Sequence, residues 1–195
     1  FAIKMALLDA AICTQGLARG KELFADLRAL QIAVRLPSQI VVNNTFNRIL
    51  RAARNPSPGG WPYQRTIGFR EYVHFGGPLA LALREMNDDL RFLLAQVSYL
   101  GKRGGFIQLL GAPSEVPSLP DGFTLLTQSV DGVFPLGILQ MLDDWGPKMT
   151  FERVNVYSED RITTGTHRIF YHVVLPYRLV RSSKSYTLYQ RIGAP

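Results

Sequence analysis

The chain has 195 residues with a formal net charge of +7, and 47% of them are hydrophobic, enough for one large domain or one domain with an appendage. No apolar run reaches the roughly 18 residues of a transmembrane helix. The single cysteine, Cys13, excludes an internal disulfide framework and a cysteine-based zinc site, and it fits a reducing cytoplasm. We expect Cys13 to be a small core residue.

The positive charge is concentrated in two stretches that contain no Asp or Glu. Residues 27–70 carry seven arginines, and residues 161–195 carry five arginines and one lysine. Together they hold 13 of the 22 cations of the chain. A field of one sign attracts polyanions, and arginine presents a planar fork that matches phosphate and stacks on bases. The pattern favours a nucleic-acid partner over a surface that is merely basic.

The first part of the chain predicts helices followed by strands. Good helix formers and apolar residues at helical spacing predict a helix over residues 1–14, ended by Gly16, and a second short helix near residues 21–27. Partial alternation predicts a half-buried strand over residues 30–36, and residues 39–43 read as a further extended segment.

A loop rich in proline and glycine, residues 55–62, lies between two strand-like segments and has arginines on both sides. This arrangement predicts a basic finger that reaches outside the body of the domain. Residues 66–75 are β-prone, Gly76-Gly77 offers positive φ for a tight turn, and residues 79–83 predict the returning strand.

The rest of the chain predicts one more helix and several short strands. Asn87 or Asp88 can cap a helix that runs to Leu100, followed by a strand at residues 106–110 and a linker at 113–120. The remaining predictions are β-like segments at 123–130, 149–157, 168–175 and 186–192, with a short helix or turn at 136–145.

The order of helix, strand, loop, strand, helix and strand predicts an α+β fold. It matches the ferredoxin-like βαββαβ plan with its first strand missing, which is also the plan of RNA-recognition modules. We expect a ferredoxin-like domain over residues 1–112, with a basic hairpin inserted near 44–66, and a small antiparallel β-rich region over 120–195. Such plans host many functions.

The segment around Gly101, Lys102, Arg103 and Gly104 is the sharpest local signal. Its glycines let the backbone approach a ligand, and two cations stand where backbone N–H groups can form an anion nest. The spacing does not match the P-loop nucleotide motif. The segment therefore predicts a phosphate contact, and the alternative is a tight turn with solvated cations.

Three amides and one aromatic residue lie in residues 42–47, directly before Arg48. Asn43 and Asn44 can read base edges or 2′-hydroxyls, and an exposed aromatic can stack on a base. The alternative is a turn, because Asn-Asn tolerates left-handed φ. We expect Arg48, Arg51 and Arg54 to line the finger, and Arg65 and Arg70 are further RNA-binding candidates.

Alternation in residues 69–75 predicts a strand with Arg70, Tyr72 and His74 on one face. These side chains could bind RNA, or cut it with His74 as the base that activates a 2′-hydroxyl. A hydrolytic pair needs a second group, and no suitably spaced histidine or carboxylate pair stands nearby. A metal site built from three scattered histidines is not expected.

Four segments, residues 1–11, 41–46, 69–72 and 99–106, together resemble the RAMP proteins of CRISPR defence. Those proteins combine a ferredoxin-like fold with a glycine-rich loop after the second helix. The order of elements, a helix that would follow a first strand and then a long basic hairpin, is most similar to that of the fifth Cas family. That family caps the 5′ handle of the guide RNA in type I effector (Cascade) complexes.

This resemblance implies an RNA-binding structural subunit without catalytic activity. Its partners would be the crRNA 5′ handle, the large subunit and the backbone RAMP subunits, with target DNA as a further candidate, and it implies no membrane, cofactor or metal. In one subtype the equivalent protein cleaves precursor RNA. A metal-independent endoribonuclease is therefore the alternative, with His74 and Tyr72 as the nearest catalytic candidates, and a basic scaffold for an acidic protein is a third reading.

Overall fold

The computed structural model describes residues 1–55, 58–84, 86–101, 104–132 and 135–193. These residues form two groups of mutually contacting segments. The first unit comprises residues 1–35, 80–135 and 139–175, and the second unit comprises residues 36–79, 136–138 and 176–195. The separate C-terminal region expected over residues 120–195 stays a prediction.

The first unit begins with three helices, α1 (Ala2–Gln15), α2 (Leu17–Glu22) and α3 (Phe24–Ala29). The predicted N-terminal helix is confirmed, and it ends at Gly16, whose φ of 92° is open to glycine at little cost. The prediction that Cys13 belongs to the core is wrong. Cys13 lies one turn after the exposed Asp9, on the solvent side of α1, with its Sγ 3.9 Å from Asp9 Oδ1.

A three-stranded antiparallel sheet has β1 (Gln31–Arg35) between β4 (Ala80–Arg84) and β5 (Thr124–Leu125). The predicted strands at residues 30–36 and 79–83 are confirmed. β4 does not return along the strand that precedes it, because it pairs with β1. Gly76 and Gly77 do not have positive φ, contrary to the prediction. The chain bends there instead, with the Gly76 N–H donating to Gln39 O at 3.0 Å.

The fourth helix, α4 (Asp88–Leu94), begins where the sequence predicts and ends earlier. Asn87 caps it, because its side-chain oxygen accepts a hydrogen bond from the Leu90 N–H at 2.9 Å. Beyond Leu94 the backbone bonds span three residues rather than four, which tightens the last turn and ends the helix. The strand predicted at residues 106–110 is absent from the described segment between α4 and β5, which holds a single isolated bridge.

The last part of the first unit contains β6 (Ile138–Trp145), α5 (Phe151–Val154) and β7 (Arg168–Leu175), with β6 and β7 paired in a two-stranded sheet. The short helix or turn predicted at 136–145 and the β segment predicted at 149–157 are both wrong. Pairing with β7 overrides the helix-forming composition of β6. Phe151 and Val154 are both buried three residues apart, which is a helical spacing.

The core of the first unit joins α1, α3, α4, β6 and α5. The buried side chains are Leu7, Leu8, Ala10, Ala11, Leu23, Leu27, Leu30, Ile32, Leu90, Leu93, Trp145, Met149, Phe151 and Val154. Trp145 stacks on Phe24 with ring centroids 5.1 Å apart. One charged pair lies within this core, since Lys4 Nζ is 2.8 Å from Asp144 Oδ2 and 2.9 Å from Arg28 O.

The second unit is a four-stranded antiparallel sheet in the order β3-β2-β9-β8. Its strands are β2 (Gln39–Ala52), β3 (Tyr63–Phe75), β8 (Tyr177–Ser182) and β9 (Tyr186–Arg191). Tyr177 is buried and donates its hydroxyl to Pro37 O, and Arg191 Nη1 donates to Leu36 O at 3.3 Å. These bonds fasten the segment before β2 to β8 and β9.

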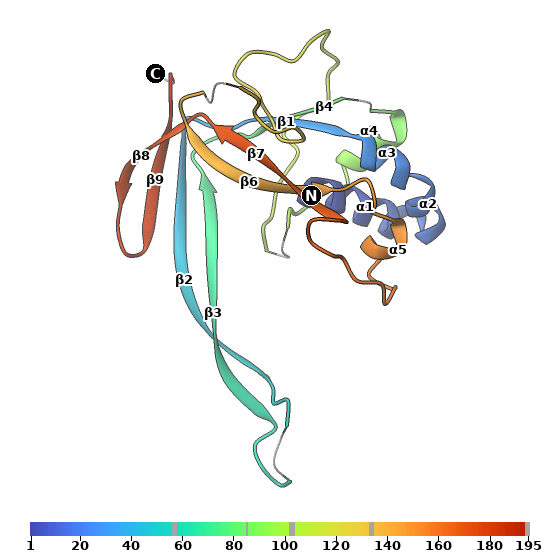
Figure 1. Ribbon diagram of the computed structural model, residues 1–195, viewed down its shortest axis with the longest axis vertical. Helices are drawn as coiled ribbons and strands as arrows, with labels where there is room; N and C mark the ends of the chain where they lie inside the picture. Colours follow the sequence, from blue (N-terminus) through green and yellow to red (C-terminus); the bar gives the residue numbers. More distant parts are fainter. Residues whose placement is uncertain (56–57, 85, 102–103, 133–134, 194–195) are drawn as a thin grey trace. The chain divides into compact units, whose positions relative to one another are not determined.

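The β2–β3 hairpin extends past the rest of its own sheet (Figure 1). The pairing of β2 with β9 ends at Asn43 and Tyr186, whereas its pairing with β3 is uninterrupted from Ile40–Phe75 to Ala52–Tyr63. Residues 44–52 and 63–71 therefore form a two-stranded extension, which together with the segment that joins them we call the arm. The strand-like segments on either side of the predicted loop do pair with each other. Residues 56–57 of that loop lie outside the described residues, and a finger inserted in a ferredoxin-like domain stays a prediction.

The chain is α+β, as the sequence predicts, with helices packed beside antiparallel sheets. The ferredoxin-like plan itself stays a prediction. None of the helices in the described ranges has the length and apolar character that a membrane span requires.

Candidate nucleic-acid interface

The arm has two chemically different faces, and its register assigns every side chain to one of them. Residues directly opposite each other in an antiparallel pair point to the same face, and successive residues alternate. One face, the polar face, carries Asn43, Thr45, Asn47, Ile49 and Arg51 opposite Tyr72, Arg70, Gly68, Thr66 and Gln64. The other, the apolar face, carries Asn44, Phe46, Arg48 and Leu50 opposite Glu71, Phe69, Ile67 and Arg65.

The polar face confirms the alternation predicted for residues 69–75. Arg70, Tyr72 and His74 share this face, and Tyr72 and His74 are both exposed. Arg70 Nη1 is 2.8 Å from Phe69 O, a bond that holds the guanidinium close to the strand. This face presents hydrogen-bonding groups and cations to solvent.

The apolar face contains the exposed aromatic predicted in residues 42–48, which is Phe46, and Phe69, which the predicted alternation placed on the face opposite Arg70. The extent of this face along the arm was not anticipated from the sequence. Phe46 is 72% exposed and its ring centroid is 5.1 Å from that of Phe69, while Ile67 is 70% exposed. Near the tip, Trp61 is 72% exposed and its ring centroid is 5.8 Å from that of Tyr63. The signal was available as the alternation of large apolar residues in 63–75. Exposed aromatics on a basic arm are groups on which bases can stack.

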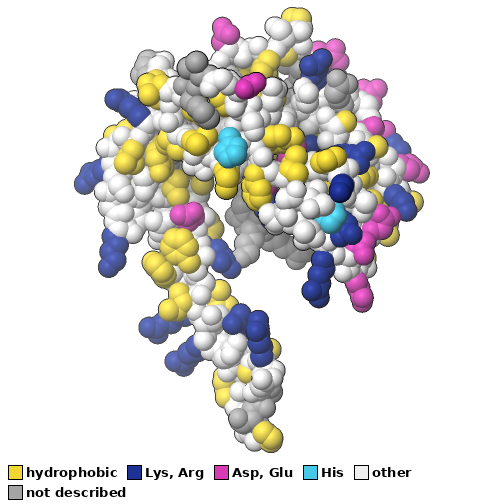
Figure 2. Space-filling view, viewed as in Figure 1, with side chains coloured by type: hydrophobic (Ala, Val, Ile, Leu, Met, Phe, Trp, Pro, Cys, Tyr) yellow, Lys and Arg dark blue, Asp and Glu magenta, His cyan; other side chains and the backbone are white. Residues whose placement is uncertain are grey.

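The predicted arginines are distributed around the arm instead of along one side. Arg48 and Arg65 lie on the apolar face, Arg51 and Arg70 on the polar face, and Arg54 in the exposed loop segment. Figure 2 shows cationic side chains, all of them arginines in this part of the sequence, standing out from the arm with hydrophobic side chains between them. Residues 44–71 contain a single acid, at the base of the arm. The arm is therefore cationic from both sides.

The two predicted asparagines do not share a surface. Residues 42–48 are part of β2, so the turn reading of this segment is wrong, and successive residues face opposite ways. Asn43 is exposed on the polar face. Asn44 lies on the apolar face opposite Glu71, and its Oδ1 is buried with no hydrogen-bond partner among the described residues.

The described ends of the glycine segment, Gly101 and Gly104, belong to the first unit. The base of the segment is the isolated bridge between Tyr99 and Phe106, and the Leu100 N–H donates to Gly105 O at 3.0 Å. Gly101 and Gly104 have φ of 73° and 105°, and both are exposed.

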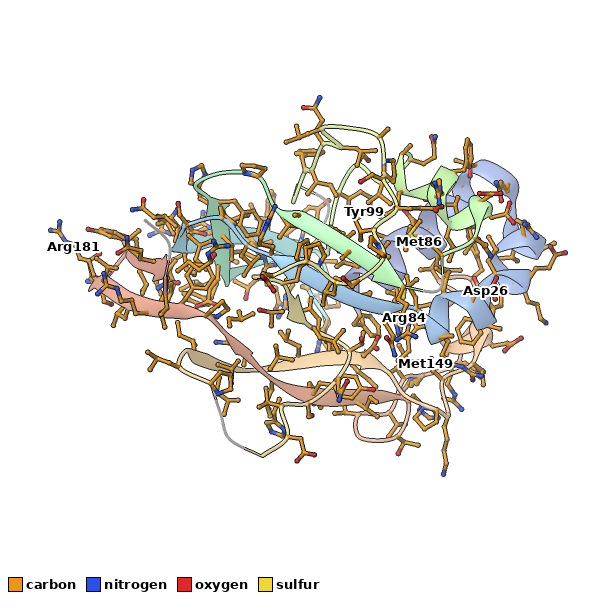
Figure 3. All side chains as sticks on the ribbon, turned by 90° about the horizontal axis from the view of Figure 1, so that it is seen from above. Asp26, Arg84, Met86, Tyr99, Met149 and Arg181 are labelled. Carbon is orange, nitrogen blue, oxygen red and sulfur yellow. The ribbon has the colours of Figure 1, made fainter. Side chains whose placement is uncertain are left out.

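Tyr99, labelled in Figure 3, joins the described residues before the glycine segment to the first helix, because its hydroxyl lies 2.9 Å from Asp9 Oδ2. The two predicted cations of the segment, Lys102 and Arg103, lie outside the described residues. The phosphate contact predicted for this segment stays a prediction.

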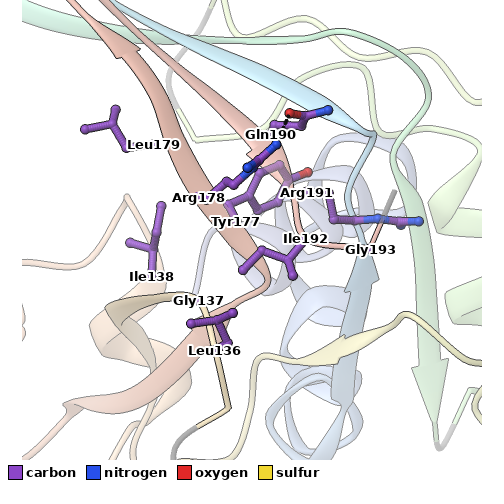
Figure 4. A pocket seen from close by; sticks show the side chains of 10 residues that line it. All are labelled: Leu136, Gly137, Ile138, Tyr177, Arg178, Leu179, Gln190, Arg191, Ile192 and Gly193. Atoms are coloured by element: carbon purple, nitrogen blue, oxygen red, sulfur yellow. Dashed lines mark hydrogen bonds between the residues drawn. The ribbon is translucent and has the colours of Figure 1, made fainter. Parts of the chain in front are cut away.

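A pocket of about 510 Å³ lies within the second unit, beside the edge strand β8 (Figure 4). Arg178 Nη2 donates to Gln190 Oε1 across it at 3.0 Å. Its lining residues are Leu136, Gly137, Ile138, Tyr177, Arg178, Leu179, Gln190, Arg191, Ile192 and Gly193. The pocket combines two guanidinium groups and an amide with apolar walls, and sequence reasoning gave no sign of it.

One curated protein shows significant sequence similarity to this chain. The CRISPR-associated protein Cas5 of Archaeoglobus fulgidus is 26% identical over 167 residues, which cover 80% of this chain and 71% of that protein. No family model and no solved structure matches the chain.

Proposed function

The chain is a Cas5-like CRISPR-associated protein, and we propose that it is an RNA-binding structural subunit of a type I effector (Cascade) complex. In this role it caps the 5′ handle of the crRNA and contacts the large subunit and the backbone RAMP subunits. The observation that carries the proposal is the basic arm. Beyond Asn44, whose N–H donates to Ser185 O, its two strands pair with no other strand among the described residues, and its cations are open to a polyanion on both sides.

The arm suits RNA by both charge and shape. Phosphate contacts set the position and strength of binding, and Arg48, Arg51 and Arg65 supply them in the outer half of the arm. Because Arg65 is opposite Leu50, the three arginines fall within three residues of one another along β2, about 10 Å at about 3.4 Å per residue. These cations can therefore contact neighbouring phosphates of one RNA strand. Asn43 adds an exposed amide at the base of the arm, where it can read a base edge or a 2′-hydroxyl.

The remaining predicted contacts belong to the same proposal. Arg54 and Arg70 extend the cationic surface of the arm toward its tip and its base. Gly101 and Gly104, with Lys102 and Arg103, would hold handle phosphates at the glycine segment, and a cytoplasmic location is part of the proposal.

The test is a salt titration of RNA binding, measured by fluorescence anisotropy with a labelled RNA that carries the repeat-derived 5′ handle. Each lost phosphate contact lowers the slope of log K against log salt by about 0.7 for a single strand. The triple variant Arg48→Gln, Arg51→Gln, Arg65→Gln should therefore bind more weakly, with a slope reduced by about 2.

The matched control removes three exposed cations from the first unit, through Lys21→Gln, Lys148→Gln and Arg161→Gln. It lowers the net charge by the same amount and should change the slope much less than the arm variant does. Equal slopes for the two triple variants would remove the arm from the proposal.

A second candidate function is a metal-independent endoribonuclease, favoured by the exposure of His74 on the same face as Tyr72 and Arg70. Histidine is the side chain best suited to take a proton from a 2′-hydroxyl near neutral pH. Repeat RNA is incubated with the protein in the presence of EDTA. Site-specific cleavage that His74→Ala abolishes and His172→Ala retains would establish the enzyme, and intact RNA would eliminate it.

A further inference from the structure

The polar face continues from the base of the arm across the rest of the second unit's sheet. In the register of β2 with β9, Asn43 is opposite Tyr186 and Gln39 is opposite Gln190. Because opposite residues share a face, the polar face passes from β2 to β9 at these positions. The same argument carries it from β9 to the edge strand β8, where Arg178 is opposite Gln190.

A bulge in β8 adds a second arginine to this face. Arg178 and Arg181 are three residues apart, so in a regular strand they would point to opposite faces. The register shifts between Leu179 and Arg181, so that Arg181 is opposite Leu188 while Arg178 is opposite Gln190. Bulges of this kind re-aim a side chain, and this one brings both guanidinium groups to the polar face.

The charge of the whole polar face has one sign. Its cations are Arg51, Arg70, Arg178 and Arg181, and no acid occurs among its residues. The complete set is Gln39, Val41, Asn43, Thr45, Asn47, Ile49, Arg51, Gln64, Thr66, Gly68, Arg70, Tyr72, His74, Arg178, Arg181, Tyr186, Leu188 and Gln190. A sheet face made of amides, hydroxyls, tyrosines and arginines complements a polyanion that also has π-faces and base edges.

Two tyrosines flank an amide in one row of this face. Tyr72, Asn43 and Tyr186 lie side by side on β3, β2 and β9. Since neighbouring strands are about 4.8 Å apart, the two tyrosine backbones are separated by about 10 Å with Asn43 between them. Tyr72 is 53% exposed and Asn43 is exposed. The row offers two stacking surfaces with a base-reading group between them.

Arg178 and Arg181 lie on the polar face of β8, the edge strand at the other end of the strand order from β3. Arg178 and Arg181 are both exposed on the edge strand, and Arg178 Nη2 is held by Gln190 Oε1 at 3.0 Å. Arg181 projects outward at the rim of the β8–β9 hairpin (Figure 3). An RNA strand whose bases stack on Tyr72 and Tyr186 can therefore place phosphates near Arg178 and Arg181 on β8.

We propose that the polar face of this sheet is a second binding surface for single-stranded RNA, continuous with the arm. Tyr72 and Tyr186 stack on bases, Asn43 contacts a base edge or 2′-hydroxyl, and Arg178 and Arg181 hold phosphates. Single-stranded RNA is the occupant because paired bases present no free π-faces to tyrosine. This inference rests on the proposed function and adds the C-terminal strands to the RNA site.

The stacking part is tested with Tyr186→Leu and a fluorescein-labelled, mixed-sequence single-stranded RNA of 20 nucleotides. Stacking of one base on an aromatic side chain contributes enough that its loss weakens binding by about 5- to 150-fold. The slope against salt should stay unchanged, because no charge is removed. The matched control is Tyr189→Leu, on the same strand but on the apolar face, which should bind as the wild type does.

The phosphate part is tested with Arg178→Gln combined with Arg181→Gln. The slope of log K against log salt should fall by about 1.4. The control pair, Lys21→Gln with Lys148→Gln, removes the same charge from exposed positions of the first unit.

A crosslinking experiment gives a readout that does not depend on affinity. RNA containing 4-thiouridine is irradiated with the wild-type protein, and the attached peptides are identified by mass spectrometry. Peptides that contain Tyr72 or Tyr186 should carry RNA, and their absence among the crosslinked peptides would overturn the inference even if the tyrosine variant had failed to fold.

The outcomes separate this inference from the proposed function. If the triple arm variant weakens RNA binding while both sheet variants match their controls, the sheet face is not an RNA surface and the proposed function stands. If the wild-type protein shows no salt-dependent RNA binding, both fail. A sheet face that binds an acidic protein instead of RNA would also overturn the inference.

Discussion

Replacing the buried Lys4 should destabilise the protein strongly, because its ammonium group is the hydrogen-bond partner of a buried carboxylate. Lys4 is 2% exposed and Asp144 is 4% exposed. Lys4 Nζ is 2.8 Å from Asp144 Oδ2, whereas Asp144 Oδ1 accepts no hydrogen bond from the described residues and lies 3.7 Å from the Phe1 amino group. In Lys4→Met the carboxylate would keep its burial and lose its main partner.

The expected cost follows from removing one member of a buried ion pair, which destabilises a protein by about 3 to 5 kcal/mol. For a chain of this length each kcal/mol shifts the melting temperature by about 2 to 4 °C. Lys4→Met should therefore melt about 6 to 20 °C below the wild type, as measured by circular dichroism. The hydrogen bond from Lys4 Nζ to Arg28 O is lost as well, which acts in the same direction.

Two controls show whether the loss of stability comes from the buried Asp144 carboxylate that has lost its partner. Lys4→Met combined with Asp144→Leu removes both charges, and replacing a whole buried pair by apolar groups is often neutral or stabilising. Lys21→Met removes an exposed lysine and should change stability by about 0.5 kcal/mol or less. A double variant that melts as low as Lys4→Met would refute the reasoning, since the loss would then come from packing.

Two further predictions concern local contacts in the first unit. Asn87→Ala removes the side-chain oxygen that accepts from the Leu90 N–H and the Nδ2 that donates to Asp26 Oδ2, and should cost about 1 kcal/mol in urea unfolding. Asn87→Ser keeps an oxygen that can cap the helix and should retain most of the stability. Burial, followed by two nearby cations, lowers the pKa of His167, so the unfolded chain binds its proton at higher pH than the folded chain does. Stability should fall as pH drops below about 6.5, because the histidine of the unfolded chain begins to bind a proton there and the histidine of the folded chain does not yet do so. Protonation in the folded chain would remove Nδ1 as the acceptor of the Thr163 N–H. His167→Asn should reduce this dependence of melting temperature on pH, and an unchanged pH profile would contradict the assignment.

Local sequence signals were sufficient for elements whose partners are near in the chain. α1 has a helical spacing of apolar residues and a glycine at its end, and both appear in the structure. The arm was predictable because a loop of proline and glycine separates two β-prone segments, which fold back on each other without any distant partner.

Elements set by distant contacts could not be predicted in the same way. β6 has a composition that suits a helix, and only its pairing with β7 makes it a strand. The opposite orientations of Asn43 and Asn44 become clear only once β2 is known to run through them. The bulge that turns Arg181 to the polar face depends on the register of β8 with β9, which no local pattern in the sequence reveals.

Because β2 pairs with β3 without interruption, the length of the arm can be changed by mutation. Since no bulge interrupts the pairing from Ile40–Phe75 to Ala52–Tyr63, residues can be deleted or inserted in matched pairs on the two strands. Changing each strand by two residues preserves the orientation of every side chain that remains. The span covered by the hairpin can thus be lengthened or trimmed in steps of about 7 Å without redesigning its surface chemistry.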